Sequence, residues 1–350
     1  MKGLILTAGN GTRLRPLSYT KPKPLLPVCN RPVISYGIEQ LYHLGIRDIG
    51  LVIQPDQEDF FKESLQPFTK QDLRFHYIYQ QEQKGIAHAV AQAEEFLDSD
   101  SFVLLLGDNL INDPLTLLQE SFMQSSAQGT VMVAEVSTPQ DYGIAEIQNQ
   151  KIINVEEKPA EPKSNLAIIG AYIFSSEIFK AIHAIPPSAR GEYEITDAIQ
   201  WMIDHGNDIH FIKAKKPTFD VGTVDRWLEA NQWMLKQYAD SKKDYSYIST
   251  NSIIIPPVEI GQNCEIIDSV IGPYVSVEAD TTIKKCMIKN SIILRGSCLE
   301  NIPYEITSSI FGERTELVGN DKMTDTIRGV FGDESKLTLS SELKDKDKSN

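Results

Sequence analysis

Two hydrophobic patterns alternate along the first part of the chain. Short apolar runs, typical of buried strands, occupy residues 4–6, 49–53, 75–79 and 102–106. Between them, apolar residues recur at helical spacing over residues 33–44, 57–65 and 87–97. This strand–helix alternation predicts a mostly parallel sheet with helices on both faces.

Strand patterns then become more frequent than helical ones. They cover residues 130–135, 143–147, 152–155 and 167–174, with few helical segments between them, which predicts that the sheet gains mixed strands here. Helical spacing returns at residues 177–183, 195–204 and 224–238. The polar segment 239–246 follows, and we interpret it as a linker.

Beyond the linker a four-residue pattern recurs at intervals of 17, 22 and 18 residues: Asn251-Ser-Ile-Ile, Asp268-Ser-Val-Ile, Asn290-Ser-Ile-Ile and Ser308-Ser-Ile-Phe. Apolar residues also lie six apart, at Ile254, Ile260 and Ile266 and again at Ile271, Val277 and Ile283. Such hexapeptide periodicity predicts a parallel β-helix with about three hexads per coil and one inward apolar residue per hexad. A β-sandwich is the alternative, but it would not keep this rhythm.

Composition adds limits to this picture. The 350 residues, 41% hydrophobic and 23% charged, exclude a disordered or collagen-like chain and indicate about two domains. We expect them at residues 1–240 and 247–333, with a flexible tail at 334–350. Because no stretch approaches the ~20 apolar residues of a membrane span, and the N-terminal apolar run is too short for a signal peptide, we expect a cytoplasmic protein without a membrane partner.

The cysteines and the net charge narrow the class of protein further. Cys29, Cys264, Cys286 and Cys298 form no CxxC pair, so we expect them to pack as small apolar side chains or free thiols. The net charge of −14 argues against a nucleic-acid polymer as partner. Residues 1–38 nevertheless hold six cations and no carboxylate, which favours a small polyanion such as a nucleoside triphosphate over a solvated basic face.

The most specific segment lies inside this basic region. Leu6-Thr-Ala-Gly-Asn-Gly-Thr-Arg-Leu-Arg-Pro places a glycine-rich loop directly after a strand, where backbone N–H groups can approach a phosphate. The loop is neither a Walker A motif nor a dinucleotide fingerprint, since Leu14 stands where a third glycine belongs. Arg13 can clamp phosphate oxygens in a fork, and Lys23 can act as a movable point charge.

This string resembles the signature of the sugar-nucleotide pyrophosphorylases. Further segments resemble motifs of the same family: Leu106-Gly-Asp-Asn, Glu157-Lys-Pro-Ala-Glu-Pro-Lys-Ser-Asn, Ser188-Ala-Arg-Gly-Glu-Tyr-Glu-Ile-Thr-Asp and Phe219-Asp-Val-Gly-Thr. The resemblance covers roughly residues 1–335 and is closest to the long form of the glucose-1-phosphate thymidylyltransferases. It implies an α/β fold, with a Rossmann-like mixed-sheet nucleotidyltransferase domain followed by a left-handed parallel β-helix.

The resemblance also implies a set of site residues. Arg13 and Lys23 would be catalytic, and Asp108 and Asp220 would hold Mg²⁺. The nucleotide would contact Ala8, Gly9, Gly11, Thr12, Gln80 and Gly85. The sugar phosphate would contact Tyr142, Gly143, Glu157, Lys158, Tyr172 and Arg190.

Taken alone, several of these residues have plainer interpretations. An aspartate after a strand is often a helix cap, Arg190 lies in a segment that reads as an exposed loop, and Tyr172 in a strand fits a core position. The glutamine-rich loop around Gln80 can equally be solvated surface. Thymine and uracil differ by one methyl group, which allows a binding site only ~1–3 kcal/mol of discrimination. The residues therefore do not decide between the two bases.

The implied reaction is attack of a sugar 1-phosphate, expected to be glucose 1-phosphate, on the α-phosphate of dTTP or UTP with release of pyrophosphate. A non-catalytic regulatory subunit that binds nucleotide sugars is the alternative. A bifunctional pyrophosphorylase–acetyltransferase is disfavoured, because all six histidines precede the β-helix. The flat faces and exposed ends of a β-helix favour association, so we expect a homo-oligomer.

Overall fold

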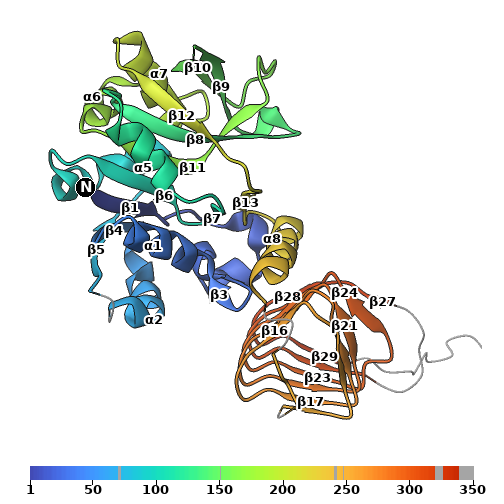
Figure 1. Cartoon of the computed structure of the whole chain (residues 1–350). Coiled ribbons are helices and arrows are strands. Elements are labelled where there is room, and N and C mark those ends of the chain that lie inside the picture. Colours follow the sequence, from blue (N-terminus) through green and yellow to red (C-terminus); the bar gives the residue numbers. More distant parts are fainter. Residues whose placement is uncertain (70–71, 150, 240–242, 247, 320–325, 339–350) are drawn as a thin grey trace, which may run out of the picture. The chain divides into compact units, whose positions relative to one another are not determined.

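A computed structural model describes residues 1–69, 72–149, 151–239, 243–246, 248–319 and 326–338. The chain divides into two compact units (Figure 1). Unit 1 comprises Met1–Asn10, Pro22–Leu25 and Pro32–Asp220, and unit 2 comprises Gly11–Lys21, Leu26–Arg31 and Val221–Asn350. Part of the expected linker, residues 240–242, and the end of the expected tail, residues 339–350, lie outside the described residues.

Unit 1 is built on the mixed sheet that the sequence predicts. Its parallel part pairs β1 (Lys2–Leu6) with β4 (Asp48–Ile53) and β6 (Phe102–Leu106), and β4 with β5 (Arg74–Tyr79). β11 (Leu166–Phe174) runs antiparallel to β6 and to β8 (Gly129–Glu135), and β9 (Gly143–Gln148) runs antiparallel to β11 and to β10 (Lys151–Glu157). The edge strand β12 (Ile209–Lys213), which the sequence analysis missed, pairs with β8.

Both faces of this sheet are covered. Along β1, Leu4 and Leu6 belong to one buried cluster and Ile5 to the other, so successive side chains enter opposite cores. The covering helices are α1 (Val33–His43), α2 (Glu58–Thr69), α3 (Ile86–Ala91), α4 (Glu94–Leu97), α5 (Thr116–Met123), α6 (Glu177–Ala184) and α7 (Ile195–Asp204). The single helix predicted over residues 87–97 is therefore wrong, because Ala93, with φ −96° and ψ 3°, leaves helical geometry between α3 and α4.

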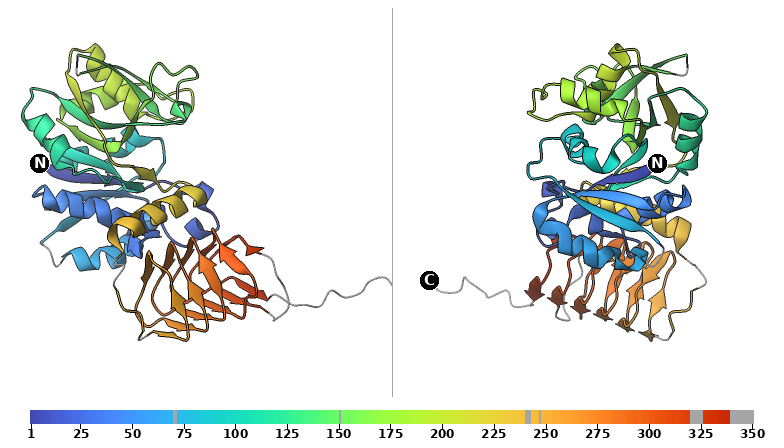
Figure 2. Two further views of the ribbon diagram at one scale, coloured as in Figure 1. Left: turned by 45° about the vertical axis from the view of Figure 1, so that its right-hand side comes forward. Right: turned by 90° about the vertical axis from the view of Figure 1, so that its left-hand side faces the viewer.

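Unit 2 contains the predicted left-handed parallel β-helix, whose short strands lie side by side in rows (Figure 2). The first row is β14 (Ser249–Thr250), β17 (Glu265–Ile267), β20 (Thr282–Lys284), β23 (Cys298–Glu300), β26 (Glu316–Val318) and β29 (Lys336–Thr338). The second is β15 (Ile253–Ile254), β18 (Val270–Ile271), β21 (Met287–Lys289), β24 (Glu305–Thr307) and β27 (Thr326–Ile327). The third is β16 (Val258–Ile260), β19 (Val275–Val277), β22 (Ser291–Ile293), β25 (Ile310–Phe311) and β28 (Val330–Phe331).

The hexapeptide spacing is confirmed by what faces inward. Ile266, Ile283, Leu299 and Leu317 stack in register on successive strands of the first row, each fully buried. The four-residue pattern, however, marks two different corners. Asp268 precedes a strand of the second row, whereas Asn290 precedes one of the third, and both have positive φ angles near 45°. Between Asp268 and Asn290 the chain completes one coil and then continues from the second row to the third, which accounts for the interval of 22 residues.

Unit 2 also includes helix α8 (Val224–Tyr238) and two N-terminal segments. Trp227 Nε1 donates to Pro27 O at 2.7 Å, and Asn231 Oδ1 accepts from Cys29 N and from Ser276 Oγ, both at 2.8 Å. Two other short ladders complete the described strands, β2 (Pro27–Val28) with β3 (Arg31–Pro32) and β7 (Asn109–Leu110) with β13 (Phe219–Asp220). Across the described ranges, we find no helix with the length and apolarity needed to cross a membrane.

Three of the four cysteines behave as small packing side chains. Cys264 and Cys286 belong to the core of the β-helix, and Cys29 is buried as well. Burial raises the pKa of the Cys29 and Cys286 thiols to about 12, so both stay protonated at neutral pH. This confirms the interpretation of these residues as packing side chains.

Candidate functional site

A pocket of about 410 Å³ opens in unit 1 at the carboxyl ends of β1 and β6, where parallel α/β sheets commonly bind ligands. Nine of the residues proposed from the sequence lie in its wall: Ala8, Gly9, Lys23, Gln80, Gly85, Asp108, Glu157, Lys158 and Arg190. Three others, Gly11, Thr12 and Arg13, belong to unit 2. Tyr142, Gly143, Tyr172 and Asp220 lie outside the pocket wall.

The loop after β1 begins in a fixed conformation. Thr7 donates to Val52 O through its amide at 2.9 Å and through its hydroxyl at 2.7 Å. Gln54 Nε2 donates to Ala8 O at 2.8 Å. A methyl group at Gly9 would meet no atom within 4 Å, so this backbone faces open space from which a ligand can approach.

The charged centre of the pocket is an ammonium shared by two carboxylates. Lys23 Nζ forms an ion pair with Asp108 and lies 3.1 Å from Asp220 Oδ1. The sheet explains the convergence, because β13 pairs with β7 and sets Asp220 opposite Asn109. Burial lowers the pKa of Lys23, but the charges and hydrogen bonds of the two aspartates outweigh it, and the net pKa is raised above 10.5. Lys23 is therefore a fixed positive charge.

The same two carboxylates fit a divalent cation. Both reach one cationic atom, Lys23 Nζ, so both can also reach one metal ion. No set of three His, Cys, Asp or Glu side chains converges as a metal site within the described residues. Asp108 and Asp220 would thus hold Mg²⁺ as a pair, with substrate phosphates and water completing the shell, which is the usual arrangement for this ion.

Gln80 and Gly85 lie at the other side of the pocket. Gln80 is buried, and its Nε2 lies 2.9 Å from His88 Nδ1 and 3.5 Å from Gly85 O. Gly85 has a φ of 101°, and a side chain there would collide with the backbone of Tyr193 at 2.5 Å. Burial, helped by nearby Lys84, lowers the pKa of His88, which keeps the imidazole neutral and able to accept from the Gln80 amide. These contacts fix the orientation of the Gln80 side chain.

A carboxylate cluster forms the third part of the pocket. Glu157 Oε2 accepts from Thr196 Oγ1 at 3.1 Å, and Glu157 Oε1 lies 3.1 Å from Arg190 Nη2. Gly143 makes room for this carboxylate, since a methyl group there would lie 3.0 Å from Glu157 Oε2 and 2.4 Å from Thr196 Cγ2. Burial and the charge of Glu194 raise the pKa of Glu157. The ionised form of Glu157 therefore lowers the stability of the folded protein, as is common for titratable groups at functional sites.

Lys158 and two tyrosines surround this cluster. Lys158 has a φ of 43°, an uncommon conformation for a residue with a side chain, and its amide donates to Tyr142 O at 3.0 Å. Its side chain is 44% exposed and reaches the pocket. Tyr172 is buried in the core and stacks on Phe174, and the charge of Glu157 adds to burial in raising its pKa.

Several residues at or beside the pocket were not predicted from the sequence. Glu192 and Glu194 line it, and Glu194 accepts from Ser188 Oγ and Arg190 Nη2, both at 2.8 Å. The available signal was the string Ser188-Ala-Arg-Gly-Glu-Tyr-Glu-Ile-Thr-Asp, in which two glutamates alternate and so can face the same arginine. His88 gave no such signal, because its partner Gln80 lies on a different element.

Comparisons with known proteins give the family of the chain. The family model for nucleotidyl transferases matches residues 2–237. The glucose-1-phosphate thymidylyltransferase of Streptomyces griseus is 34% identical over 97% of this chain and 100% of its own length. Two solved structures superpose on about two thirds of the chain and 98% of theirs: one described as a glucose-1-phosphate thymidylyltransferase from Bacillus anthracis in complex with a sucrose (34% identity, TM-score 0.63), and a UDP-glucose pyrophosphorylase complexed with UDP-glucose (27%, 0.60).

In unit 1, a glycine-rich loop, a lysine and two aspartates lie close together at the strand ends of a mixed α/β sheet. This arrangement is typical of an enzyme that binds phosphate groups. The chain belongs to the nucleotidyl transferase family, and within it to the sugar-nucleotide pyrophosphorylases.

Proposed function

We propose that the protein joins glucose 1-phosphate to dTTP, releasing pyrophosphate and forming a nucleoside diphosphate sugar. A phosphate oxygen of the sugar phosphate forms a bond to the α-phosphorus as the bond from that phosphorus to the pyrophosphate oxygen breaks. The observation that carries the proposal is a pocket lined by Lys23, Asp108, Gln80 and Glu157, in which Lys23 also pairs with Asp220 just outside the wall. The full-length likeness to the Streptomyces thymidylyltransferase supports the choice of substrates.

The residues expected from the family resemblance have distinct roles in this proposal. Backbone groups of Ala8, Gly9, Gly11 and Thr12 approach the triphosphate, and Arg13 and Lys23 stabilise the charge that develops on the departing pyrophosphate. Mg²⁺ held by Asp108 and Asp220 would supply further charge neutralisation at the phosphates. No protein nucleophile is needed, because alignment and charge neutralisation are the main requirements of phosphoryl-type transfer.

Recognition of base and sugar falls to the two sides of the pocket. Gln80, oriented by His88, meets the base edge, with Gly85 beside it. Glu157 accepts from sugar hydroxyls, and Lys158 and Arg190 hold the sugar phosphate, with Tyr142, Gly143 and Tyr172 shaping that side. Arg190 contacts Glu157 and Glu194 in the structure, so the incoming phosphate takes over part of its hydrogen bonding.

The test is pyrophosphate release with Mg²⁺, glucose 1-phosphate and each of dTTP, UTP, GTP, CTP and ATP in turn. We expect the highest kcat/KM with dTTP. Preference for UTP would keep the mechanism and change the base assignment. If no pyrophosphate is released with any of these nucleotides, with glucose 1-phosphate or with other sugar 1-phosphates, the proposal is refuted.

A further inference from the structure

The segment 11–21 links two stretches of the pocket wall. It leaves unit 1 after Asn10 and returns to it at Pro22, one residue before Lys23, and both Asn10 and Lys23 line the pocket. Between these ends it carries Arg13, which we have proposed for the triphosphate. Both ends of the segment are therefore joined by a short stretch of backbone to residues that line the pocket.

The segment has a compact local structure. It forms two short 3-10 turns, η1 (Thr12–Leu14) and η2 (Leu17–Tyr19), and buries Leu14 and Leu17. Ser18 Oγ donates to Gly11 O at 2.7 Å and closes the loop. Its cations have no acidic partner nearby in the chain, because the first carboxylate of the whole sequence is Glu39. Ion pairs to this segment must therefore come from distant residues.

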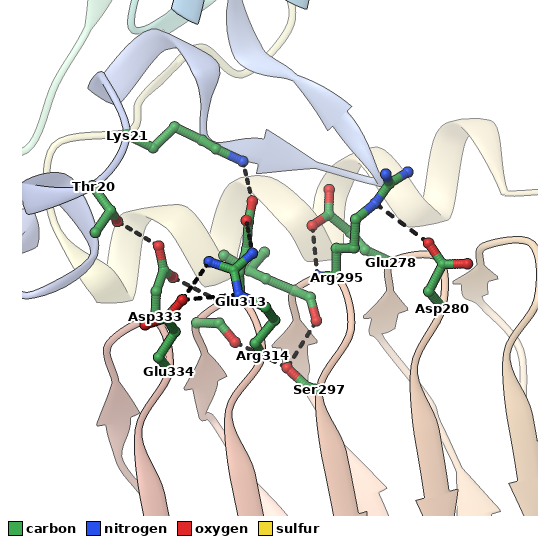
Figure 3. Close-up of polar contacts among 12 residues, drawn as sticks. Thr20, Lys21, Glu278, Asp280, Arg295, Ser297, Glu313, Arg314, Asp333 and Glu334 are labelled. Atoms are coloured by element: carbon green, nitrogen blue, oxygen red, sulfur yellow. Dashed lines mark hydrogen bonds and ion pairs between the residues drawn. The ribbon is translucent and has the colours of Figure 1, made fainter.

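The last coils of the β-helix supply those partners (Figure 3). Lys21 Nζ forms an ion pair with Glu313, and Thr20 Oγ1 donates to Asp333. Pro16 also lies against Gly332, where an added methyl group would meet the proline ring at 3.1 Å. We call Thr20, Lys21, Glu313 and Asp333 the loop anchor.

The carboxylates of the loop anchor are themselves held in place. Asp333 Oδ1 accepts from Glu313 N at 2.7 Å, which joins two successive coils. Glu278, from an earlier coil, accepts from Arg295 N at 3.0 Å, and the charge of Lys21 opposes the effect of burial on the pKa of Glu278. Lys21 and Glu313 are only 28% and 18% exposed, so this pair is better shielded from water than ordinary surface pairs.

We propose that the loop anchor is a positioning device for the nucleotide: Glu313 and Asp333 fix segment 11–21 and thereby the placement of Arg13. The inference rests on the proposed function, and it gives the β-helix a part in the reaction. Small displacements are costly here, since a shift of about 1 Å at a reacting centre can lower a rate by ~10²-fold. Glu313 and Asp333 are positioning residues, because they act through Lys21 and Thr20.

The test compares full-length Glu313→Gln/Asp333→Asn with Glu305→Gln, whose carboxylate pairs with Lys289 at 2.6 Å elsewhere on the β-helix. We expect the anchor variant to raise KM for the nucleotide about 10-fold while KM for the sugar phosphate changes less than about twofold. The control variant should match the wild type in both constants. Glu313→Asp, which keeps the charge, should restore part of the lost nucleotide affinity.

A second readout does not depend on activity. Hydrogen exchange at the amides of Leu14 and Tyr19, which are hydrogen-bonded within the segment, should become about 10-fold faster in the anchor variant. An unchanged nucleotide KM in the folded variant would overturn the inference, as would an equal loss for both substrates with a lowered Tm. An inactive wild-type enzyme would overturn the proposed function and the positioning role with it, while the exchange data would still report whether the anchor holds the segment.

Discussion

Replacing Lys23 by methionine tests the electrostatics of the pocket most directly. The methionine keeps the length of the side chain and removes its charge, which leaves Asp108 and Asp220 facing each other without the shared ammonium. Breaking a fully buried ion pair costs about 3–5 kcal/mol, whereas an exposed pair is worth about 0–1 kcal/mol. Since Lys23 is 10% exposed and the aspartates 30% and 27%, we expect an intermediate loss of about 2 kcal/mol, or about 4–8 °C in Tm.

The loss should depend on metal in a defined way. If Mg²⁺ binds the two carboxylates as proposed, it must displace Lys23 from them in the wild type, whereas Lys23→Met removes this competitor. We therefore expect Mg²⁺ to raise the Tm of the variant more than that of the wild type. The pKa of Lys23 is raised, so its stabilising contribution is fully present below pH 10.5 and is lost only as the pH rises through the folded value; the difference should be constant between pH 6 and 9.

The assay is thermal unfolding with and without Mg²⁺, combined with pyrophosphate release. We expect kcat to fall by about 10²–10³-fold, as when one electrostatic stabiliser of a transition state is removed. Lys213→Met is the matched control, because its ammonium pairs with the exposed Glu135 at 2.6 Å, and its Tm and kcat should stay near the wild-type values. Near-normal turnover of folded Lys23→Met, or an identical Mg²⁺ response in both proteins, would refute the reasoning.

Two further predictions concern the sugar side of the pocket. Glu157→Gln should be more stable than the wild type at neutral pH, because the raised pKa means that folding disfavours the ionised carboxylate. This gain in stability should shrink as the pH falls through the folded pKa, and it should vanish below the ordinary value of 4.5. Urea unfolding at several pH values will check this. The same variant should lose about 10–100-fold in kcat/KM for the sugar phosphate, and unchanged kinetics would remove Glu157 from the site. Gly143→Ala places a methyl group 2.4 Å from Thr196 Cγ2, so it should destabilise unit 1 by about 1–3 kcal/mol, and a variant with unaltered urea midpoint would contradict this packing.

The elements that the sequence predicted well are those whose periodicity is uninterrupted. Helices α7 and α8 have the predicted bounds, and the predicted hexad positions from Ile260 to Ile283 are buried, whereas Ile254 is half-buried. The break between α3 and α4 was missed because no glycine or proline marks it, and apolar spacing continues through Ala93. Strand β12 was missed because His210 interrupts its apolar run. A polar residue is tolerated there, since β12 is an edge strand and, among the described strands, pairs only with β8.

Residue types at the site were predictable, but their contacts were not. Lys23 meets partners 85 and 197 positions away, and only the pairing of β7 with β13 brings them together. Periodicity reports which face of an element is apolar, and it carries no information about which distant loop lies opposite. The membership of segments 11–21 and 26–31 in unit 2 is of the same kind, since it follows from packing against residues two hundred or more positions later.

The stacking of the β-helix sets a fixed spacing between residues on different coils. Each coil advances the stack by the spacing of neighbouring strands, ~4.8 Å, and contacts mainly the coils before and after it. Helix α8 is bonded to an early coil through Asn231 and Ser276, whereas Glu313 and Asp333 stand on late ones. If the loop anchor positions segment 11–21 as proposed, removing one whole coil between these contacts would move Glu313 and Asp333 by about one strand spacing, so the number of coils would matter for the reaction as well as their sequence.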